Sequence, residues 1–185
     1  ELWQHLTDLG LNYYALHEAL GGVAAEQSVV SNVLIAESLA KGDFSLTAGL
    51  LSTFSVINAI TRWGSTEVQS TYLNSFAEDT ELKATFAFQE ATPAFNPFQL
   101  KTKATETNGQ FTITGEKSLV ILGQHADLLL VSAEFHGQPD IFVVQSNQTI
   151  SIKANPAMGL KATETVTLQF NQTPAVRLGD ADFDY

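Results

Sequence analysis

The sequence predicts an α+β chain in which a helical bundle, residues 1–82, precedes an antiparallel β-domain, residues 83–185. Apolar residues recur at helical spacing as far as about Asp79, and from Lys83 onward they alternate with polar residues at a period of two. The two kinds of segment do not alternate along the chain, as they would in a doubly wound parallel sheet. We therefore expect two packed domains or one α+β unit.

The first half contains three segments whose apolar residues fall at helical spacing. They are Val29, Val33 and Leu34; then Leu50, Phe54, Ile57 and Ile60; then Val68, Tyr72 and Phe76. Asp43 is expected to cap the middle helix, which Gly64 would end, and Ser65 is expected to cap the next helix at once. Connections this short predict antiparallel neighbours.

The second half contains short alternating segments that predict strands: ATFAF, KTKATET, QFTITGE, IFVVQ, ISIKA and TVTLQF. Asn108-Gly109, between two of them, is typical of a type I′ hairpin turn. The first strand ends at Gln89-Glu90, and a turn containing Pro93 and Pro97 follows. A single carboxylate in such a corner indicates either a simple turn or a binding site, and the residues alone leave both readings open.

Composition excludes several classes of protein. The net charge of −11 opposes a broad electrostatic grip on nucleic acid or on an anionic membrane surface. The absence of cysteine excludes disulfides and thiolate metal sites, so we expect a cytoplasmic protein. The longest apolar runs fall short of the roughly 20 residues that span a bilayer, so no membrane span is predicted.

Few residues form a chemical motif. The histidines His5, His17, His125 and His136 are scattered without a second ligand at suitable spacing, so we expect solvated or structural roles and no metal site. The sequence also lacks a P-loop, a dinucleotide-binding glycine motif and a nucleophile elbow. The corner at Glu90 is the remaining candidate.

At this corner the sequence resembles the acyl-CoA dehydrogenase family. That family's middle domain opens with a small-aromatic strand, a Thr-Glu-Pro turn, a Gly-Ser-Asp segment and a Lys-Thr-x-Ala strand. The corresponding residues here are FAFQEA from Phe86, AFN from Ala94 and KTKA from Lys101. The resemblance continues through NGQFTITGEKSLVILGQHADLLLVSA and MGLKATETVTLQFNQTPAVRLGD, and upstream in LWQHLTDLGLNYYALHEALGGV and RWGSTEVQSTYLNSF.

The resemblance implies a helical N-terminal domain, a β-barrel-like middle domain and FAD as cofactor. It places Phe86, Phe88 and Gln89 at flavin-facing positions, where Gln89 replaces a threonine and keeps an amide donor. Leu119 stands at the position of a tryptophan beside the flavin ring, and Ile121 at the position of a threonine hydroxyl. Phe95 replaces a serine associated with the thioester ligand, which makes it the candidate substrate-binding residue.

In function, the resemblance implies part of an enzyme that oxidises acyl-CoA thioesters, passes electrons to an acceptor flavoprotein and forms homo-oligomers. The family's proton-abstracting glutamate belongs to a C-terminal bundle, so we expect no catalytic residue and no turnover in this chain by itself. The alternative is a dehydrogenase-like scaffold or binding protein that has lost FAD, which the residues at positions 89, 95, 119 and 121 favour. Flavin absorbance of the full-length protein discriminates the two.

Overall fold

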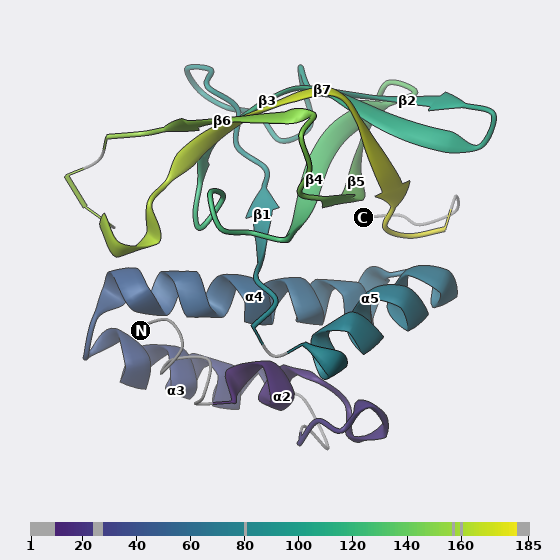
Figure 1. Cartoon of the computed structure of the whole chain (residues 1–185). Coiled ribbons are helices and arrows are strands. Elements are labelled where there is room, and N and C mark those ends of the chain that lie inside the picture. The colour runs from purple at the N-terminus through teal and green to yellow at the C-terminus, as the bar shows by residue number, and fades with distance from the viewer. Residues whose placement is uncertain (1–9, 24–27, 80, 157, 160, 181–185) are drawn as a thin grey trace.

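The computed structural model describes residues 10–23, 28–79, 81–156, 158–159 and 161–180, which leaves the expected role of His5 and both ends of the chain outside the described residues. A helical layer lies beneath a layer of strands (Figure 1). The helical elements are α2 (Leu11–Ala15), η1 (Glu18–Leu20), α3 (Val29–Ala40), α4 (Phe44–Trp63) and α5 (Thr66–Glu78). The predicted α+β fold class is confirmed.

Capping side chains start two of the helices where the sequence predicts. The Asp43 side chain accepts a hydrogen bond from the Leu46 amide at 2.8 Å, which starts α4. The Ser65 side chain accepts from the Val68 amide at 3.2 Å, which starts α5. Both predicted N-caps are confirmed, and Gly64 lies between the two helices as expected.

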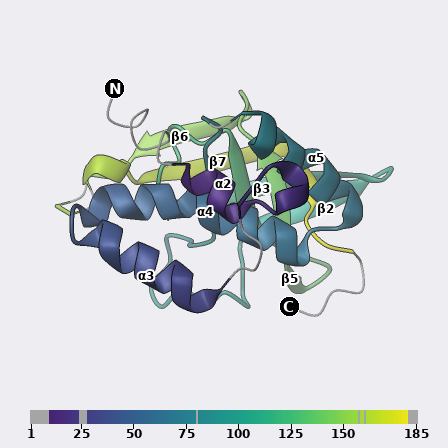
Figure 2. The same cartoon turned by 90° about the horizontal axis from the view of Figure 1, so that it is seen from below.

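The helix α3 carries its apolar residues on an exposed face. Seen from below, α2 and α3 lie on the side of α4 that points away from the strands (Figure 2). The apolar residues that predicted α3 are largely exposed: Val29 at 78%, Val33 at 59% and Leu34 at 57%. The spacing predicted the helix correctly, but this face of α3 has no cover from the described residues.

The second half of the chain forms strands β1 (Ala84–Ala87), β2 (Lys103–Thr107), β3 (Gln110–Val120), β4 (Leu128–Phe135), β5 (Gln138–Gln145), β6 (Ile150–Ala154) and β7 (Val166–Arg177), with η2 (Lys161–Thr163) before β7. Asn108 and Gly109 both have positive φ, 52° and 78°, as a type I′ turn requires. The predicted hairpin between β2 and β3 is therefore confirmed.

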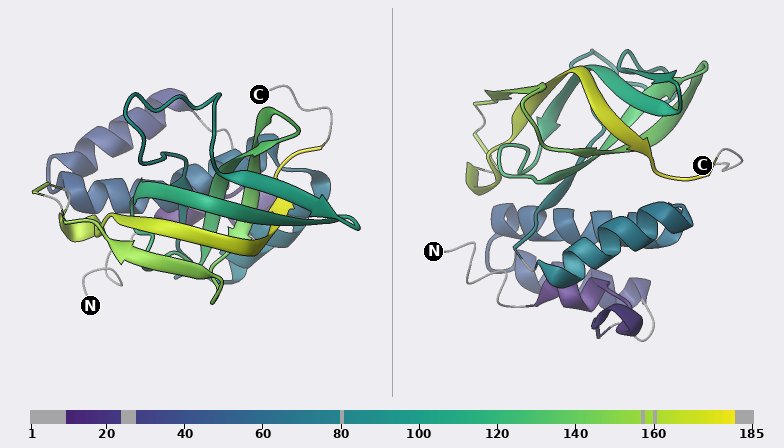
Figure 3. Two further views of the ribbon diagram at one scale, coloured as in Figure 1. Left: turned by 90° about the horizontal axis from the view of Figure 1, so that it is seen from above. Right: turned by 45° about the vertical axis from the view of Figure 1, so that its right-hand side comes forward.

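The strands curve round into a closed ring. Their order is β1-β4-β2-β3-β7-β5, β5 also pairs with β4, and β6 lies on the free side of β7. Most pairs are antiparallel as predicted, but β1 runs parallel to β4, and β2 meets β4 through one parallel pair, Lys103 with Glu134. Figure 3 shows this curved β-layer from above and beside the helices. Closure leaves fewer free strand edges.

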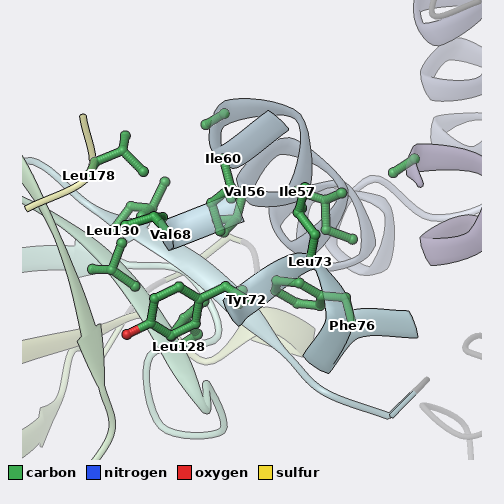
Figure 4. Close-up of a cluster of buried hydrophobic side chains, with 14 of the residues drawn as sticks. Val56, Ile57, Ile60, Val68, Tyr72, Leu73, Phe76, Leu128, Leu130 and Leu178 are labelled. Atoms are coloured by element: carbon green, nitrogen blue, oxygen red, sulfur yellow. The ribbon is translucent and has the colours of Figure 1, made fainter. Parts of the chain in front are cut away.

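Two apolar clusters form the core. One fills the barrel and includes Ile113, Phe142 and Leu168. The other joins the two layers, where residues of α4 and α5 such as Ile57 and Phe76 pack in one cluster with Leu128, Leu130 and Leu178 of the β-layer (Figure 4). The helices and strands therefore share a continuous interface.

The strand β4 contributes to both clusters, because its alternate side chains point to opposite faces. Leu128 and Leu130 face the helices, whereas Leu129 and Val131 face the barrel interior. Burial on both sides explains why this segment reads as a continuous apolar run, DLLLVSA, without alternation. The sequence pattern did not predict this strand for that reason.

The core helix α4 is also notable for its length and its apolar composition. Among the described residues, it is the one helix long and apolar enough to cross a bilayer, over Phe44–Trp63. The core helix of a globular protein meets the same criterion, and Val56, Ile57 and Ile60 of α4 are fully buried against other elements. The packing of α4 in the core accounts for its apolar composition.

Candidate cofactor site

The corner after β1 is organised by an ion pair that is closed off from solvent. The side chains of Lys117 and Glu90 are 0% and 4% exposed, and Lys117 Nζ lies 3.0 Å from Glu90 Oε1. Glu90 follows β1, and Lys117 lies in β3. Isolated buried charges are costly, so this pair indicates a specific arrangement of the surrounding groups.

The Glu90 carboxylate accepts hydrogen bonds from the far end of the loop that it begins. The Lys101 amide donates to Glu90 Oε2 at 2.9 Å, and the Thr102 amide donates to Oε1 at 2.9 Å. Burial by itself would raise the pKa of Glu90, but these amides, the Thr102 side chain and Lys117 lower it to about 2. The carboxylate is therefore ionised at neutral pH.

The Lys117 ammonium uses its three donors within the corner. It donates to the Phe88 carbonyl at 3.1 Å, to Glu90 Oε1 at 3.0 Å and to Ser132 Oγ at 3.0 Å. Burial lowers the pKa of Lys117, and the Glu90 carboxylate opposes that shift. One side chain thus connects β3, the end of β1 and β4.

A glycine allows the loop to pass close to β3. Gly115 has φ of 146°, and a Cβ atom at this position would lie 2.6 Å from Thr102 Cα. No other residue fits so near the backbone of Thr102. The Thr102 hydroxyl in turn donates to the Glu116 carbonyl at 3.2 Å, which fixes Thr102 beside the Glu90 carboxylate.

A β-bulge in β3 places Leu119 at the surface. The register with β7 shifts between Lys117 and Val120, and Leu119 has φ of 53°. Leucine is strained in this left-handed region, at a cost of roughly 1–3 kcal/mol. The side chain of Leu119 is nevertheless 52% exposed, so burial in the core does not account for the strain.

Three predicted cofactor residues meet in one cavity. Phe86, Leu119 and Ile121 line a cavity of about 260 Å³ together with residues of α4 and Thr85. Two further lining residues are bonded to each other, since Ser52 Oγ donates to Thr85 Oγ1 at 2.8 Å. The cavity combines apolar walls with hydroxyl groups, a composition typical of small-molecule sites.

The other predicted residues, Phe88, Gln89 and Phe95, are not among those that line this cavity. The ring of Phe88 packs on that of Phe86 with centroids 4.9 Å apart, and Phe88 is 37% exposed. Gln89 is exposed, and its carbonyl accepts from the Ser118 amide at 2.8 Å. Phe95 is half-buried in the loop after Glu90 and does not line this cavity.

A second cavity adjoins the first. It has a volume of about 570 Å³, lies between α3 and α4, and shares Leu51, Ser55 and Phe86 with the first cavity. Two amide oxygens in its lining, those of Asn32 and Asn58, are buried without a hydrogen-bond partner. Phe86 therefore lines both cavities along α4.

The pairing of Glu90 with Lys117 was not predicted. The sequence marks Glu90 as a candidate corner residue, whereas Lys117 lies 27 positions further along, within the segment NGQFTITGEKSLVILGQHADLLLVSA that carries the family resemblance. A lysine at an inward position of an alternating strand is the one signal that indicates a buried partner. Of the three histidines that the structure describes, His17 caps η1, His125 lies 3.1 Å from Glu164 at the surface, and the ring of His136 packs against that of Phe135.

Comparison with known proteins gives consistent matches along the chain. A family model of the acyl-CoA dehydrogenase N-terminal domain matches residues 1–80, and a model of the acyl-CoA dehydrogenase middle domain matches residues 85–173. The short/branched chain specific acyl-CoA dehydrogenase, mitochondrial, of Rattus norvegicus is 30% identical over 90% of this chain and 40% of its own length.

Solved structures share the fold. Butyryl-CoA dehydrogenase from Megasphaera elsdenii superposes with a TM-score of 0.85 at 23% identity, covering 97% of this chain and 50% of that one. A structure described as the FAD complex of PigA gives a TM-score of 0.83 at 20% identity, covering 97% and 49%. The chain thus spans about half the length of these proteins, and the barrel-like β-half agrees with both.

Proposed function

The chain belongs to the acyl-CoA dehydrogenase family, and from this premise we propose that the polypeptide that carries it binds FAD and oxidises acyl-CoA thioesters. The observation that supports the proposal is the convergence of Phe86, Leu119 and Ile121 on one cavity. These residues come from β1, from the bulged end of β3 and from the turn that follows it, so their meeting depends on the tertiary fold. The FAD complex among the related structures gives independent support.

The residues present fit a flavin. Phe86, Leu119 and Ile121 supply an apolar wall that would exclude water from one face of a ring. The family resemblance assigns the polar edge of the ring to the side-chain amide of Gln89, which is exposed and does not line the cavity. FAD supplies a two-electron acceptor when bound. The chain's own contribution is to hold the wall and the donors in place before the ligand arrives, which lowers the cost of ordering them.

For the substrate we propose an acyl-CoA thioester, with Phe95 as a contact residue. The rat relative is named for short or branched acyl chains, and Phe95 lies in the loop that starts at the same corner as the proposed flavin wall. An aromatic ring at this point would narrow the proposed binding groove for the acyl-CoA thioester. An electron-accepting flavoprotein as partner follows from the same activity.

The second candidate is a scaffold protein without flavin. Ile121 favours it, because an apolar side chain in the cavity wall offers no hydrogen bond to a flavin nitrogen.

Homo-oligomerisation is proposed for either candidate, because α3 carries the exposed apolar residues Val29, Val33 and Leu34. We also propose that the protein is cytoplasmic and has no membrane span. A division into two domains between residues 82 and 83 is likewise a proposal.

A titration of FAD into the complete gene product, followed by fluorescence quenching, tests the proposal. Saturable quenching supports a flavoprotein, and its absence supports the scaffold. Leu119→Trp with Ile121→Thr should tighten binding by about two- to tenfold, since each added hydrogen bond is worth about 0.5–1.5 kcal/mol. Gln89→Leu should weaken binding by a similar factor.

A matched control comes from β6, where Ile152 is a 43% exposed apolar residue that does not line the cavity. Ile152→Trp adds the same ring at the surface and should leave FAD affinity unchanged. Equal affinities in all variants would show that this cavity is not a flavin site.

A further inference from the structure

We propose that Glu90 and Lys117 form a clasp that sets two surfaces at once. One is the end of β1 at Phe88, whose ring packs on Phe86 of the proposed cofactor wall, and the other is the loop of residues 91–100. Both are positioning residues, because neither lines the cavity. The part that concerns the cofactor rests on the proposed function above. The part that concerns the loop depends only on the contacts of the pair.

The first arm of the clasp closes the loop. Glu90 lies immediately before it, and its carboxylate accepts from the amides of Lys101 and Thr102, which lie immediately after it. Inside the loop, the Asn96 side chain accepts from the Phe98 amide at 3.0 Å, and Phe98 is 76% exposed. The loop tip is thus a local turn at the surface, and the charged carboxylate holds the two ends together.

The second arm holds the end of β1. Lys117 Nζ donates to the Phe88 carbonyl, and Ser132 Oγ donates to the same carbonyl at 3.3 Å. β1 ends at Ala87, so Phe88 lies beyond the strand pairing, and its carbonyl accepts these hydrogen bonds there. Without them, the Phe88 carbonyl would lose its two side-chain donors at the point where the ring packs on Phe86.

The two arms meet at one oxygen. Glu90 Oε1 accepts from both the Thr102 amide and Lys117 Nζ, so the loop end and the strand end share a single charged group. A displacement of either end therefore weakens the bonds of the other. This arrangement would couple the loop that carries Phe95 to the flavin wall.

Amide hydrogen exchange at Lys101 and Thr102, combined with FAD titration of the complete gene product, tests the clasp. In Glu90→Gln the two amides should exchange at least about tenfold faster than in the wild type, and FAD should bind at least about tenfold more weakly. Ser132→Ala removes one acceptor of Lys117 and should shift FAD affinity in the same direction by a smaller factor. It provides a measurement if Glu90→Gln does not fold.

Asp140→Asn is the matched control. The Asp140 side chain is 4% exposed, like that of Glu90, and pairs with Arg177 Nε at 2.6 Å between β5 and β7. It should lower stability without changing exchange at Lys101 and Thr102 or FAD affinity.

Unchanged exchange or unchanged FAD affinity in Glu90→Gln would overturn the clasp, and so would equal effects in Asp140→Asn. If the wild type binds no FAD, the proposed function is wrong and the coupling to the cofactor wall falls with it. The exchange rates would then still decide whether the pair closes the loop.

Discussion

The buried carboxylate of Glu90 should make folding stability depend on pH. Its pKa is about 2 in the folded protein, against 4.5 for an unperturbed glutamate. Because the folded-state pKa is depressed, the ionised carboxylate contributes stability above pH 4.5, and this contribution is lost as the pH falls toward 2. Glu90→Gln removes this titration.

The magnitude follows from the difference between the two pKa values. Each pKa unit corresponds to about 1.4 kcal/mol, so the carboxylate contributes on the order of 3 kcal/mol at neutral pH. The Glu90 side chain is only 4% exposed, so solvent screening reduces this figure little. The loss in the variant includes the cost of leaving Lys117 buried without its charged partner.

Urea unfolding of the wild type and of Glu90→Gln at several pH values between 7 and 3 measures the effect. The wild type should be more stable at pH 7, and the difference between the two proteins should shrink as the pH falls below about 4.5. Glu134→Gln is the comparison, because Glu134 pairs with the 66% exposed Lys103 at the surface. Its smaller effect should decrease with added salt. Stability curves of wild type and Glu90→Gln that run parallel across this range would refute the reasoning.

Three further predictions concern single positions. Ile57→Ala should lower the free energy of unfolding by roughly 2–5 kcal/mol, because Ile57 of α4 is fully buried in the cluster that joins the helices to the β-layer; a loss below 1 kcal/mol in urea unfolding would contradict this. Asp43→Ala should cost about 1 kcal/mol by removing the bond to the Leu46 amide, whereas Asp43→Asn should retain most of it; equal losses in thermal unfolding would exclude the capping role. Leu119→Gly should keep or raise stability by up to about 1 kcal/mol, since glycine tolerates φ of 53°, while FAD binding weakens. A loss of both stability and FAD affinity would indicate that the Leu119 side chain stabilises the core.

The local features of this fold were predictable from the sequence because neighbouring residues determine them. Asp43 and Ser65 bond to amides three positions along the chain, so their capping roles follow from local geometry. Asn108-Gly109 adopts positive φ because those residues tolerate it. The change of apolar period near Lys83 likewise distinguishes helices from strands.

Some elements depended on the tertiary surroundings. The pattern did not predict β4, because a strand buried on both faces has no alternation to show. It predicted the helix α3 from apolar residues at helical spacing, and of these Val29 and Leu34 are exposed. Spacing identifies a helical face, but only the neighbouring elements decide whether that face is covered.

The candidate site likewise combines features that the sequence determined with contacts that only the tertiary structure decided. By itself, the sequence determined the helix-then-strand order, the carboxylate at the corner and, through its resemblance to a family, the residues that would face a flavin. Only the tertiary structure brought Phe86 to Leu119 and Glu90 to Lys117, because those contacts join strands that are distant in sequence. Ring closure of the sheet and the bulge in β3 set these long-range contacts, and neither leaves a periodic signal in a single sequence.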